Sequence, residues 1–362
     1  MITAYLMAII LVIPVLILHE ILSSNRKGNN HSRYSIVAWY VILVFVIIIG
    51  LRDLASISIE HFIHNDEYQY RKSYDLLIGT PFTLSNINSY EWGRYLLDWT
   101  LANVFKNSQM WVFCYALITN YLYVRTIKRY VKPFWFGIFL YITVGVFSFQ
   151  MNQTSSLLSS AILLLGINFI IERKFWKYLL VVIIASGIHF SAWIVLPLYF
   201  VLNKKFFTKG TVLWVIISVL FMSGFNYISN IILPKTPYIN YLYEINSEDA
   251  YGVNIFRVLI FSSVFIFILI FKEKPLNYSR VDQYFSNVIV VLLAINITSA
   301  AYVYIYRFNE FFIIALIYML PRVVYSFQRS VRYPILIVVV IGFLIFGLQQ
   351  NWSELYKNII FG

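Results

Sequence analysis

Apolar runs long enough to cross a lipid bilayer recur along the whole chain, and they constrain its fold more than any other feature. A run of about 18 residues or more matches the length of a membrane-spanning helix. Only 12% of the residues are charged, and the mean hydropathy is +0.74. A soluble domain carries about 25% charged residues, so too few polar side chains remain to cover a water-facing surface. The sequence therefore predicts an all-α, polytopic membrane protein.

We expect about ten transmembrane helices within one integral membrane domain over residues 1–362. The first apolar run has no basic n-region and no small-residue cleavage site, so we expect it to remain as a helix. The predicted spans are residues 3–22, 35–51, 109–125, 133–149, 154–171, 211–233, 253–271, 284–305, 309–326 and 333–349.

The basic residues predict the orientation of these spans. Nineteen of the 28 Lys and Arg residues lie in loops that would share one side of the membrane. They are Arg26, Lys27, Arg33, Arg125, Lys128, Arg129, Lys132, Arg173, Lys174, Lys177, Lys204, Lys205, Lys209, Lys272, Lys274, Arg280, Arg322, Arg329 and Arg332. The positive-inside rule assigns that side to the cytoplasm and both termini to the non-cytoplasmic side. The net charge of +12 is thus dispersed over short loops, which argues against nucleic acid as a partner.

Residues 176–202 form an apolar segment with lysines on both flanks. A single span would place one basic cluster outside, whereas two short helices with a turn near residues 186–189 would keep both inside. Each arm has about 12 residues, roughly 18 Å at 1.5 Å per residue, which is less than a full crossing. We therefore predict a re-entrant hairpin, whose turn must be lined by protein or water. One long tilted helix is the alternative.

The longest non-cytoplasmic loop, residues 52–108, holds seven of the sixteen acidic residues. Aromatic and aliphatic residues recur in it at helical spacing, which predicts amphipathic outer-face helices within residues 60–106. Most of its acids are expected to be ordinary surface charges. Asp66, Glu67, Glu91 and Arg94 stand among aromatic residues, so a surface role and a functional role are equally open for them. A second outer loop is predicted over residues 234–252.

A few polar residues interrupt the apolar segments. His189 lies in the middle of the hairpin, where ionisable groups are costly and usually functional, and histidine exchanges protons near neutral pH. Arg307 and Glu310 form a polar island that is either an ion pair with headgroup contacts or part of a phosphate clamp. Asn152 and Gln153, at an outer turn, could equally cap helices.

Known catalytic and cofactor motifs are absent from the sequence. It contains no P-loop, no GxGxxG, no HExxH and no cluster of Cys and His ligands. The single cysteine, Cys114, allows no internal disulfide and indicates no metal site. We therefore predict neither a metal nor a cofactor.

In their order along the chain, the polar motifs resemble those of the EpsG family of Wzy-type polysaccharide polymerases. The matching pieces are Gly50-Leu51-Arg52, the cluster of Asp66, Tyr68 and Tyr70, Glu91-Trp92-Gly93-Arg94-Tyr95, Gln153, Gly187-Ile188-His189-Phe190-Ser191-Ala192 with Leu196-Pro197, and Tyr306-Arg307. The series covers most of the chain. One departure is Asn152-Gln153, where the family pattern favours Arg-Gln. If that arginine binds phosphate in relatives, either Arg257 or Arg94 takes its place here or the role of this turn is different.

The resemblance implies an O-antigen, capsule or exopolysaccharide polymerase of the bacterial inner membrane. Such an enzyme transfers a growing glycan from undecaprenyl pyrophosphate to a sugar hydroxyl of a lipid-linked repeat unit. Donor, acceptor and lipid bilayer are then the expected partners, with a chain-length regulator as a further candidate. The reaction takes place on the outer face, where the charge pattern independently places the unusual polar residues.

This activity leads to hypotheses for individual residues. A general base must accept the proton of the acceptor hydroxyl, for which His189 is the first candidate, followed by Glu91 and Asp66. Cations should meet the pyrophosphate leaving group, and the candidates are Arg52, Arg257, Arg307 and Arg94. Sugar binding is predicted for Tyr68, Tyr70, Trp92, Tyr95, Asn152, Gln153 and Glu310.

Three other functions are compatible with a polytopic membrane protein. A flippase or other transporter should show charges along a path through several helices and weak repeat symmetry, and the sequence shows neither. An O-antigen ligase would share the donor, but a very large outer loop near the C-terminus would favour it, and residues 234–252 are only moderate in length. A membrane O-acyltransferase would draw its acyl donor from the cytoplasmic side, away from His189.

Overall fold

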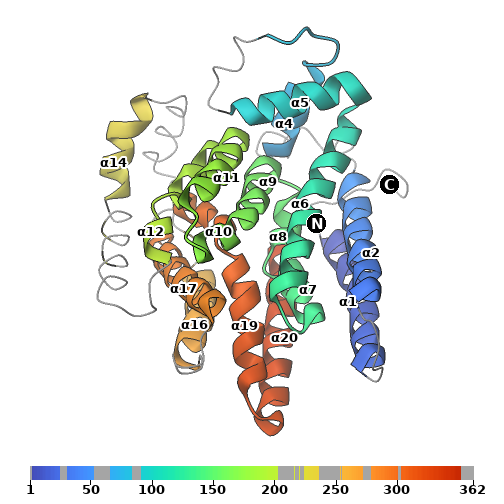
Figure 1. The fold of residues 1–362 in the computed structure, drawn as a ribbon, viewed down its shortest axis with the longest axis vertical. Helices are drawn as coiled ribbons and strands as arrows, with labels where there is room; N and C mark the ends of the chain where they lie inside the picture. Colours follow the sequence, from blue (N-terminus) through green and yellow to red (C-terminus); the bar gives the residue numbers. More distant parts are fainter. Residues whose placement is uncertain are drawn as a thin grey trace. The chain divides into compact units, whose positions relative to one another are not determined.

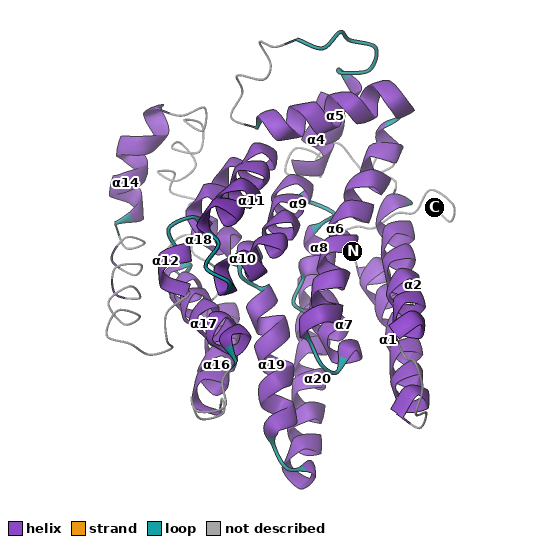
Figure 2. Cartoon of the chain, viewed as in Figure 1, coloured by secondary structure: helices purple, strands orange, loops and turns teal. Residues whose placement is uncertain are grey.

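The computed structural model is built from helices, and no strand occurs in the parts that it describes (Figures 1 and 2). These parts are residues 2–24, 31–52, 66–83, 91–202, 224–235, 255–271, 279–300 and 303–351, with single positions at 216, 220 and 253. The all-α prediction is confirmed. The chain divides into two compact units. Unit 1 comprises Met1–Gly166, Leu180–Trp193 and Phe327–Gly362, and unit 2 comprises Ile167–Leu179 and Ile194–Ser326.

Helix α6 is the centre of unit 1 and packs against α2, α5, α7 and α9. Its first turn is capped by Asn107, whose side chain accepts a hydrogen bond from the backbone N–H of Gln109. Lys128 and Arg129 lie in its last turn, where positive charge is favourable. The helices of this unit are α1 (Ile2–Ser24), α2 (His31–Gly50), α4 (Asp66–Asp75), α5 (Trp92–Phe105), α6 (Ser108–Tyr130), α7 (Phe134–Thr143), α8 (Val146–Phe149), α9 (Thr154–Leu163), η2 (Leu164–Gly166) and α20 (Arg329–Asn351).

Helix α17 is the centre of unit 2 and packs against α12, α16 and α19. It begins with a capping box, in which the side chains of Ser279 and Asp282 each bind the other residue's backbone N–H. The helices of unit 2 are α10 (Ile167–Ile171), α12 (Tyr199–Leu202), α14 (Phe225–Ile232), η4 (Leu233–Lys235), α16 (Ile255–Phe271), α17 (Arg280–Thr298), α18 (Val303–Tyr306), η6 (Arg307–Phe311) and α19 (Ile314–Ser326).

Among the described residues, four helical stretches are long and apolar enough to cross a membrane. They are Ile2–Ser23, Thr154–Ile171, Arg280–Thr298 and Arg329–Asn351. Shorter apolar helices occur at Ser35–Gly50, Phe134–Thr143, Phe175–Ile188, Phe190–Leu202, Ile255–Phe271 and Ile314–Ser326. These features are those of a membrane protein, and the number of ten spans stays a prediction.

Two of the expected spans differ from the described helices. The span predicted over residues 133–149 is interrupted at Gly145, whose φ of 98° separates α7 from α8. Glycine adopts this left-handed conformation without steric strain. The span predicted over residues 211–233 lies largely outside the described residues, as do Lys204, Lys205 and Lys209.

The chain reverses direction after α11 (Phe175–Ile188), close to the predicted turn at residues 186–189. It continues through η3 (Phe190–Val195) to α12. Near the start of α11, the Tyr178 hydroxyl donates a hydrogen bond to the Val195 carbonyl at 2.8 Å, and its ring stacks on Tyr199 with centroids 5.4 Å apart. The two arms are therefore antiparallel. Whether this hairpin is re-entrant in a bilayer stays a prediction.

Two helices, α4 and α5, form within the first long loop, as the spacing of its aromatic residues predicts. Helix α5 lies crosswise at the end of α6 in Figure 1. Its exposed side carries Trp92, Leu96 and Val104, while Asp98 is buried against the protein. A helix on a water-facing surface would instead expose its charged side chains and bury its apolar ones. The second predicted loop, 234–252, lies outside the described residues beyond Lys235.

Candidate functional site

A histidine and a glutamate that are 98 residues apart in sequence meet in unit 1. His189 directly follows the end of α11, and Glu91 directly precedes α5. The Nδ1 atom of His189 lies 2.9 Å from Oε1 of Glu91. Their side chains are 23% and 14% exposed, respectively. The pair is thus mostly enclosed but accessible to a molecule from outside.

Glycines allow these two chain segments to approach each other. A Cβ atom on Gly93 would lie 2.9 Å from the backbone carbonyl carbon of Gly187, and one on Gly187 would lie 2.6 Å from the ring of Trp92. Neither distance is compatible with ordinary van der Waals contact. Helix α9 also contacts this end of α11, since the Ser159 hydroxyl donates to the Ala185 carbonyl at 2.8 Å. The start of α5 and the end of α11 are therefore held in close contact beside His189.

Arg94 lies next to this pair, one helical turn after Glu91. Its Nη1 forms an ion pair with Oε2 of Glu91, and its Nε lies 3.9 Å from Oδ2 of Asp98. The guanidinium also stacks over the ring of Tyr70, 4.9 Å from the centroid. One cation is thus shared by two carboxylates and an aromatic face.

Asp98 is the buried end of this cluster and is only 4% exposed. Its Oδ1 accepts hydrogen bonds from Trp111 Nε1 at 2.7 Å and from the Tyr115 hydroxyl at 2.6 Å. Burial raises the pKa of Asp98 to about 6, although these two donors and Arg94 oppose the rise. The carboxyl is therefore mainly ionised at neutral pH.

We define the acid–base cluster as Glu91, Arg94, Asp98 and His189. Sequence reasoning singled out three of these residues and treated Asp98 only as one of seven loop acids. The missed signal is the spacing of Glu91, Arg94 and Asp98 at i, i+3 and i+7, which places all three on one face of a helix.

Other predicted site residues of unit 1 lie at the ends of neighbouring helices. The backbone N–H of Asp66, at the start of α4, donates to Oδ1 of Asn152 at 3.0 Å. Arg52 follows α2 and is 3% exposed. Its carbonyl accepts a hydrogen bond from Gln109 Nε2 at 3.1 Å. Gln109, which the sequence analysis did not single out, also accepts from Arg71 Nη2 at 3.2 Å.

The aromatic residues predicted to bind sugars have different surroundings. Tyr95 stacks on Phe82 with centroids 5.8 Å apart, and its hydroxyl accepts from the Thr83 backbone at 3.3 Å. Trp92 is exposed on one side and contacts Gly187 on the other. Gln153 precedes α9 directly. The side chain of Tyr68 lies outside the described residues, and the sugar-binding roles stay predictions.

Unit 2 holds the remaining predicted residues. The guanidinium of Arg257, near the start of α16, lies over the Tyr306 ring at 5.1 Å from its centroid. Arg307 follows in η6 and is exposed, whereas Glu310 in the same short helix is buried. The roles proposed for Arg257, Arg307 and Glu310 stay predictions.

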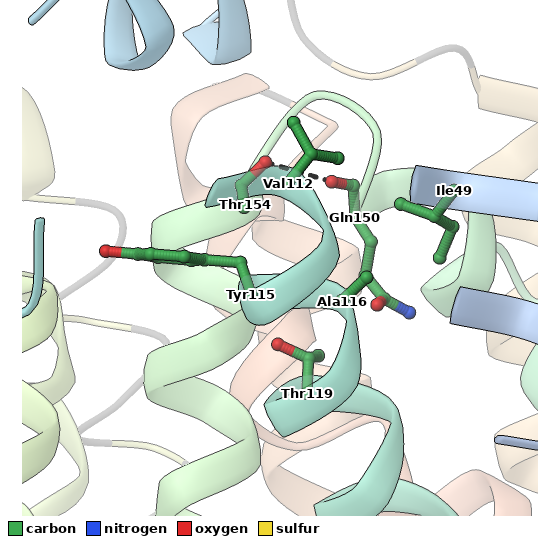
Figure 3. A pocket seen from close by; sticks show the side chains of 7 residues that line it. All are labelled: Ile49, Val112, Tyr115, Ala116, Thr119, Gln150 and Thr154. Carbon is green, nitrogen blue, oxygen red and sulfur yellow. Dashed lines mark hydrogen bonds between the residues drawn. The ribbon is translucent and has the colours of Figure 1, made fainter. Parts of the chain in front are cut away.

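Tyr115, whose hydroxyl binds Asp98, also lines a small cavity in unit 1, and Figure 3 shows the side chains around that cavity. Its lining residues are Ile49, Val112, Tyr115, Ala116, Thr119, Gln150 and Thr154. The cavity measures about 10 Å³, which is room for about one water molecule. It is therefore too small to hold a sugar.

A buried amide network lies beside this cavity and was not anticipated from the sequence. Asn120 Nδ2 donates to Gln150 Oε1 at 2.9 Å, and the Tyr141 hydroxyl donates to Asn120 Oδ1 at 2.8 Å. Such interhelical hydrogen bonds fix helix packing in an apolar environment. We assign this network a structural role.

No group of three His, Cys, Asp or Glu side chains suitable for a metal ion occurs within the described ranges. The acid–base cluster contains two carboxylates, but the guanidinium of Arg94 lies between them. The arrangement can hold and move a proton at His189 and present positive charge beside it.

Comparison with known families gives a match along most of the chain. The EpsG family model matches residues 54–359. Neither the curated proteins nor the solved structures contain a match. The resemblance drawn from the polar motifs is confirmed.

Proposed function

Because the chain belongs to the EpsG family, the family of Wzy-type polymerase-like proteins, we propose that it is a polysaccharide polymerase. In this proposal, the growing glycan leaves undecaprenyl pyrophosphate and joins a sugar hydroxyl of a lipid-linked repeat unit. The reaction takes place on the outer face of the bacterial inner membrane. The observation that carries the proposal within the site is the contact between His189 and Glu91.

This contact prepares His189 to act as a general base. An ionised carboxylate only accepts hydrogen bonds, so Nδ1 of His189 must carry the hydrogen that lies toward Glu91. The lone pair is then on Nε2, which is free of this contact and can accept the proton of an acceptor hydroxyl. General-base catalysis of this kind contributes about 10²–10⁴-fold to a rate.

The reaction balances without a further reactant. The acceptor oxygen attacks the anomeric carbon of the donor, and the bond between that carbon and the pyrophosphate oxygen breaks. Nε2 of His189 takes the hydroxyl proton, and the pyrophosphate leaves with the electron pair of the broken bond. Arg94 and Arg52 are the proposed cations of unit 1 for the developing negative charge.

The surroundings of the cluster fit a lipid-linked substrate. The exposed side of α5 presents Trp92, Leu96 and Val104, an apolar surface suited to lipid or a prenyl chain. Trp92 also lies beside Gly187, two residues from the proposed base, where an aromatic ring can stack on a sugar face. Sugar and lipid would then bind at adjoining parts of the same helix.

Glycan length in a host that lacks its own polymerase, but keeps the matching repeat-unit pathway, tests this function. Wild type should restore a ladder of polymer, whereas His189→Ala at equal membrane expression should leave single lipid-linked repeats. If single repeats instead accumulate on the cytoplasmic leaflet when the protein is absent, the chain is a flippase. Normal polymerisation by His189→Ala would contradict the assignment of the base.

A further inference from the structure

We propose that Asp98 is a positioning residue whose negative charge balances Arg94, so that Glu91 keeps its own charge available to orient His189. This inference rests on the proposed function. Asp98 contacts no reacting atom and acts through Arg94 and Glu91. It is the most buried residue of the acid–base cluster, and it neither accepts the acceptor proton nor binds the pyrophosphate.

The geometry forms a continuous series of contacts. Asp98 Oδ2 faces Arg94 Nε at 3.9 Å, Arg94 Nη1 pairs with Glu91 Oε2, and Glu91 Oε1 binds His189 Nδ1 at 2.9 Å. Glu91 therefore uses a different oxygen for each of its two neighbours in this series. In this series, a change in the charge of Asp98 alters the pairing of Arg94 with Glu91, and through Glu91 it affects the imidazole of His189.

The two carboxylate oxygens of Asp98 have different partners, since Oδ1 accepts the hydrogen bonds and Oδ2 faces a cation. Trp111 and Tyr115 both donate to Oδ1, and an asparagine oxygen could accept the same two bonds. The buried site therefore does not need a carboxylate to satisfy its donors. Burying an ionised carboxylate is unfavourable unless a cation compensates it. Arg94 is the cation that faces Oδ2, so the negative charge acts on Arg94.

The charges of the cluster lead to the same conclusion. With both carboxylates ionised, Arg94 positive and His189 neutral, the cluster has a net charge of −1, and it becomes neutral when His189 takes a proton. Without the charge of Asp98, Arg94 would neutralise Glu91, and the cluster would become positive on proton uptake. Asp98 therefore favours the state that follows proton transfer from the acceptor.

The test is the isosteric variant Asp98→Asn, with Asp75→Asn as the matched control. Asp75 is an exposed acid of the same loop, at the end of α4. Polymerisation by Asp98→Asn should fall roughly 10- to 100-fold, by analogy with the removal of a residue that orients a metal-binding side chain. The loss should lie in kcat with little change in KM, since Asp98 touches no substrate. Asp75→Asn should match wild type.

A second measurement does not depend on activity. The ¹⁵N spectrum of histidine-labelled protein, with the resonance assigned by His189→Gln, reports which ring nitrogen carries hydrogen. Wild type should show His189 with hydrogen on Nδ1, and Asp98→Asn should shift the population toward hydrogen on Nε2. If Asp98→Asn does not fold, Tyr115→Phe removes a hydrogen bond that favours the ionised form of Asp98, and it should cause the same changes at smaller amplitude.

The outcomes separate the two proposals. If wild type makes no polymer, the proposed function fails, and the tautomer measurement alone then decides the role of Asp98. An unchanged tautomer in Asp98→Asn overturns the positioning role, even if activity falls. An altered tautomer with full polymerisation also overturns it, because the orientation of His189 would then not matter for the reaction.

Discussion

The carboxylate of Glu91 contacts both the imidazole of His189 and the guanidinium of Arg94. A single side chain thus joins a group that can accept a proton to a group that can bind an anion. At the residue scale, this double contact explains why a glutamate precedes α5 and an arginine follows one turn later. The same contact leads to the first prediction.

Glu91→Gln should lower the rate of polymerisation by about 10²-fold or more, because the amide keeps the size of the side chain but not the charge that stabilises a protonated His189. Glycan ladders from membranes with equal amounts of protein measure the effect. Glu172→Gln is the control, since Glu172 is half exposed and pairs with Lys174 at the surface. Equal polymer from Glu91→Gln and Glu172→Gln would contradict the role of Glu91.

Asp98 should also give the protein an unusual dependence of stability on pH. Its pKa is raised by burial to about 6, whereas that of an aspartate in an unfolded chain is about 3.9. Between these values the folded protein binds more protons than the unfolded chain, so the contribution of Asp98 to stability falls as pH rises from about 4 to 6. The charged or titratable groups that face it are Arg94, Glu91, Tyr115 and Tyr74.

Asp98→Asn removes this titration. The melting temperature of the variant minus that of wild type should therefore increase from pH 4 to pH 6 and level off above pH 7. Thermal unfolding in detergent, followed at several pH values, measures this difference. A difference that stays constant or decreases over this range would contradict the assignment.

At the scale of helices, the site depends on the close approach of α5 and α11. Gly93→Ala should separate the two helices, because the new methyl group meets the backbone of Gly187 and not a movable side chain. We expect a loss of about 1–3 kcal/mol in stability, as for other overpacked contacts, together with reduced polymerisation.

Gly342→Ala in α20 is the matched control for this prediction, since a Cβ there meets nothing within 4 Å. This change should leave polymerisation unaltered and stabilise the helix by up to about 1 kcal/mol. Unfolding temperature and glycan length, measured for both variants, test the pair of predictions. Similar behaviour of the two variants would show that the contact between the helices does not matter.

Helices are also the scale at which the sequence was most informative. Hydropathy located α1, α2 and α20, because each carries one uninterrupted apolar run. The lysine flanks of the segment 176–202 predicted its reversal. In contrast, the interruption at Gly145 was not visible, because an apolar run has the same composition whether or not its helix breaks.

For the site, the sequence identified single residues but not the contacts between distant parts of the chain. Glu91, Arg94 and His189 could be selected as candidates because each is a polar residue in apolar or aromatic surroundings. Their direct contact could not be predicted, since it depends on the packing of Gly93 against Gly187. Asp98 was missed because its buried hydrogen bonds come from Trp111 and Tyr115 on another helix.

At the scale of the whole molecule, the loop charges predict the orientation in the membrane. The positive-inside rule predicts that the end of α20 lies outside the cytoplasm. Alkaline phosphatase fused after Asn351 should therefore be active, and green fluorescent protein fused at the same point should remain dark. The opposite result would place the acid–base cluster on the cytoplasmic side and contradict the proposed location of the reaction.

Elongation by the purified protein in liposomes is the most direct test of the central claim. The liposomes would contain a lipid-linked repeat unit, and mass spectrometry would measure glycan length and the release of polyprenyl pyrophosphate. Our account predicts glycans of two or more repeats with one pyrophosphate carrier released per bond, and a rate at least about 10²-fold lower for His189→Ala. Repeat units that remain single, or that only cross the bilayer, would contradict polymerisation.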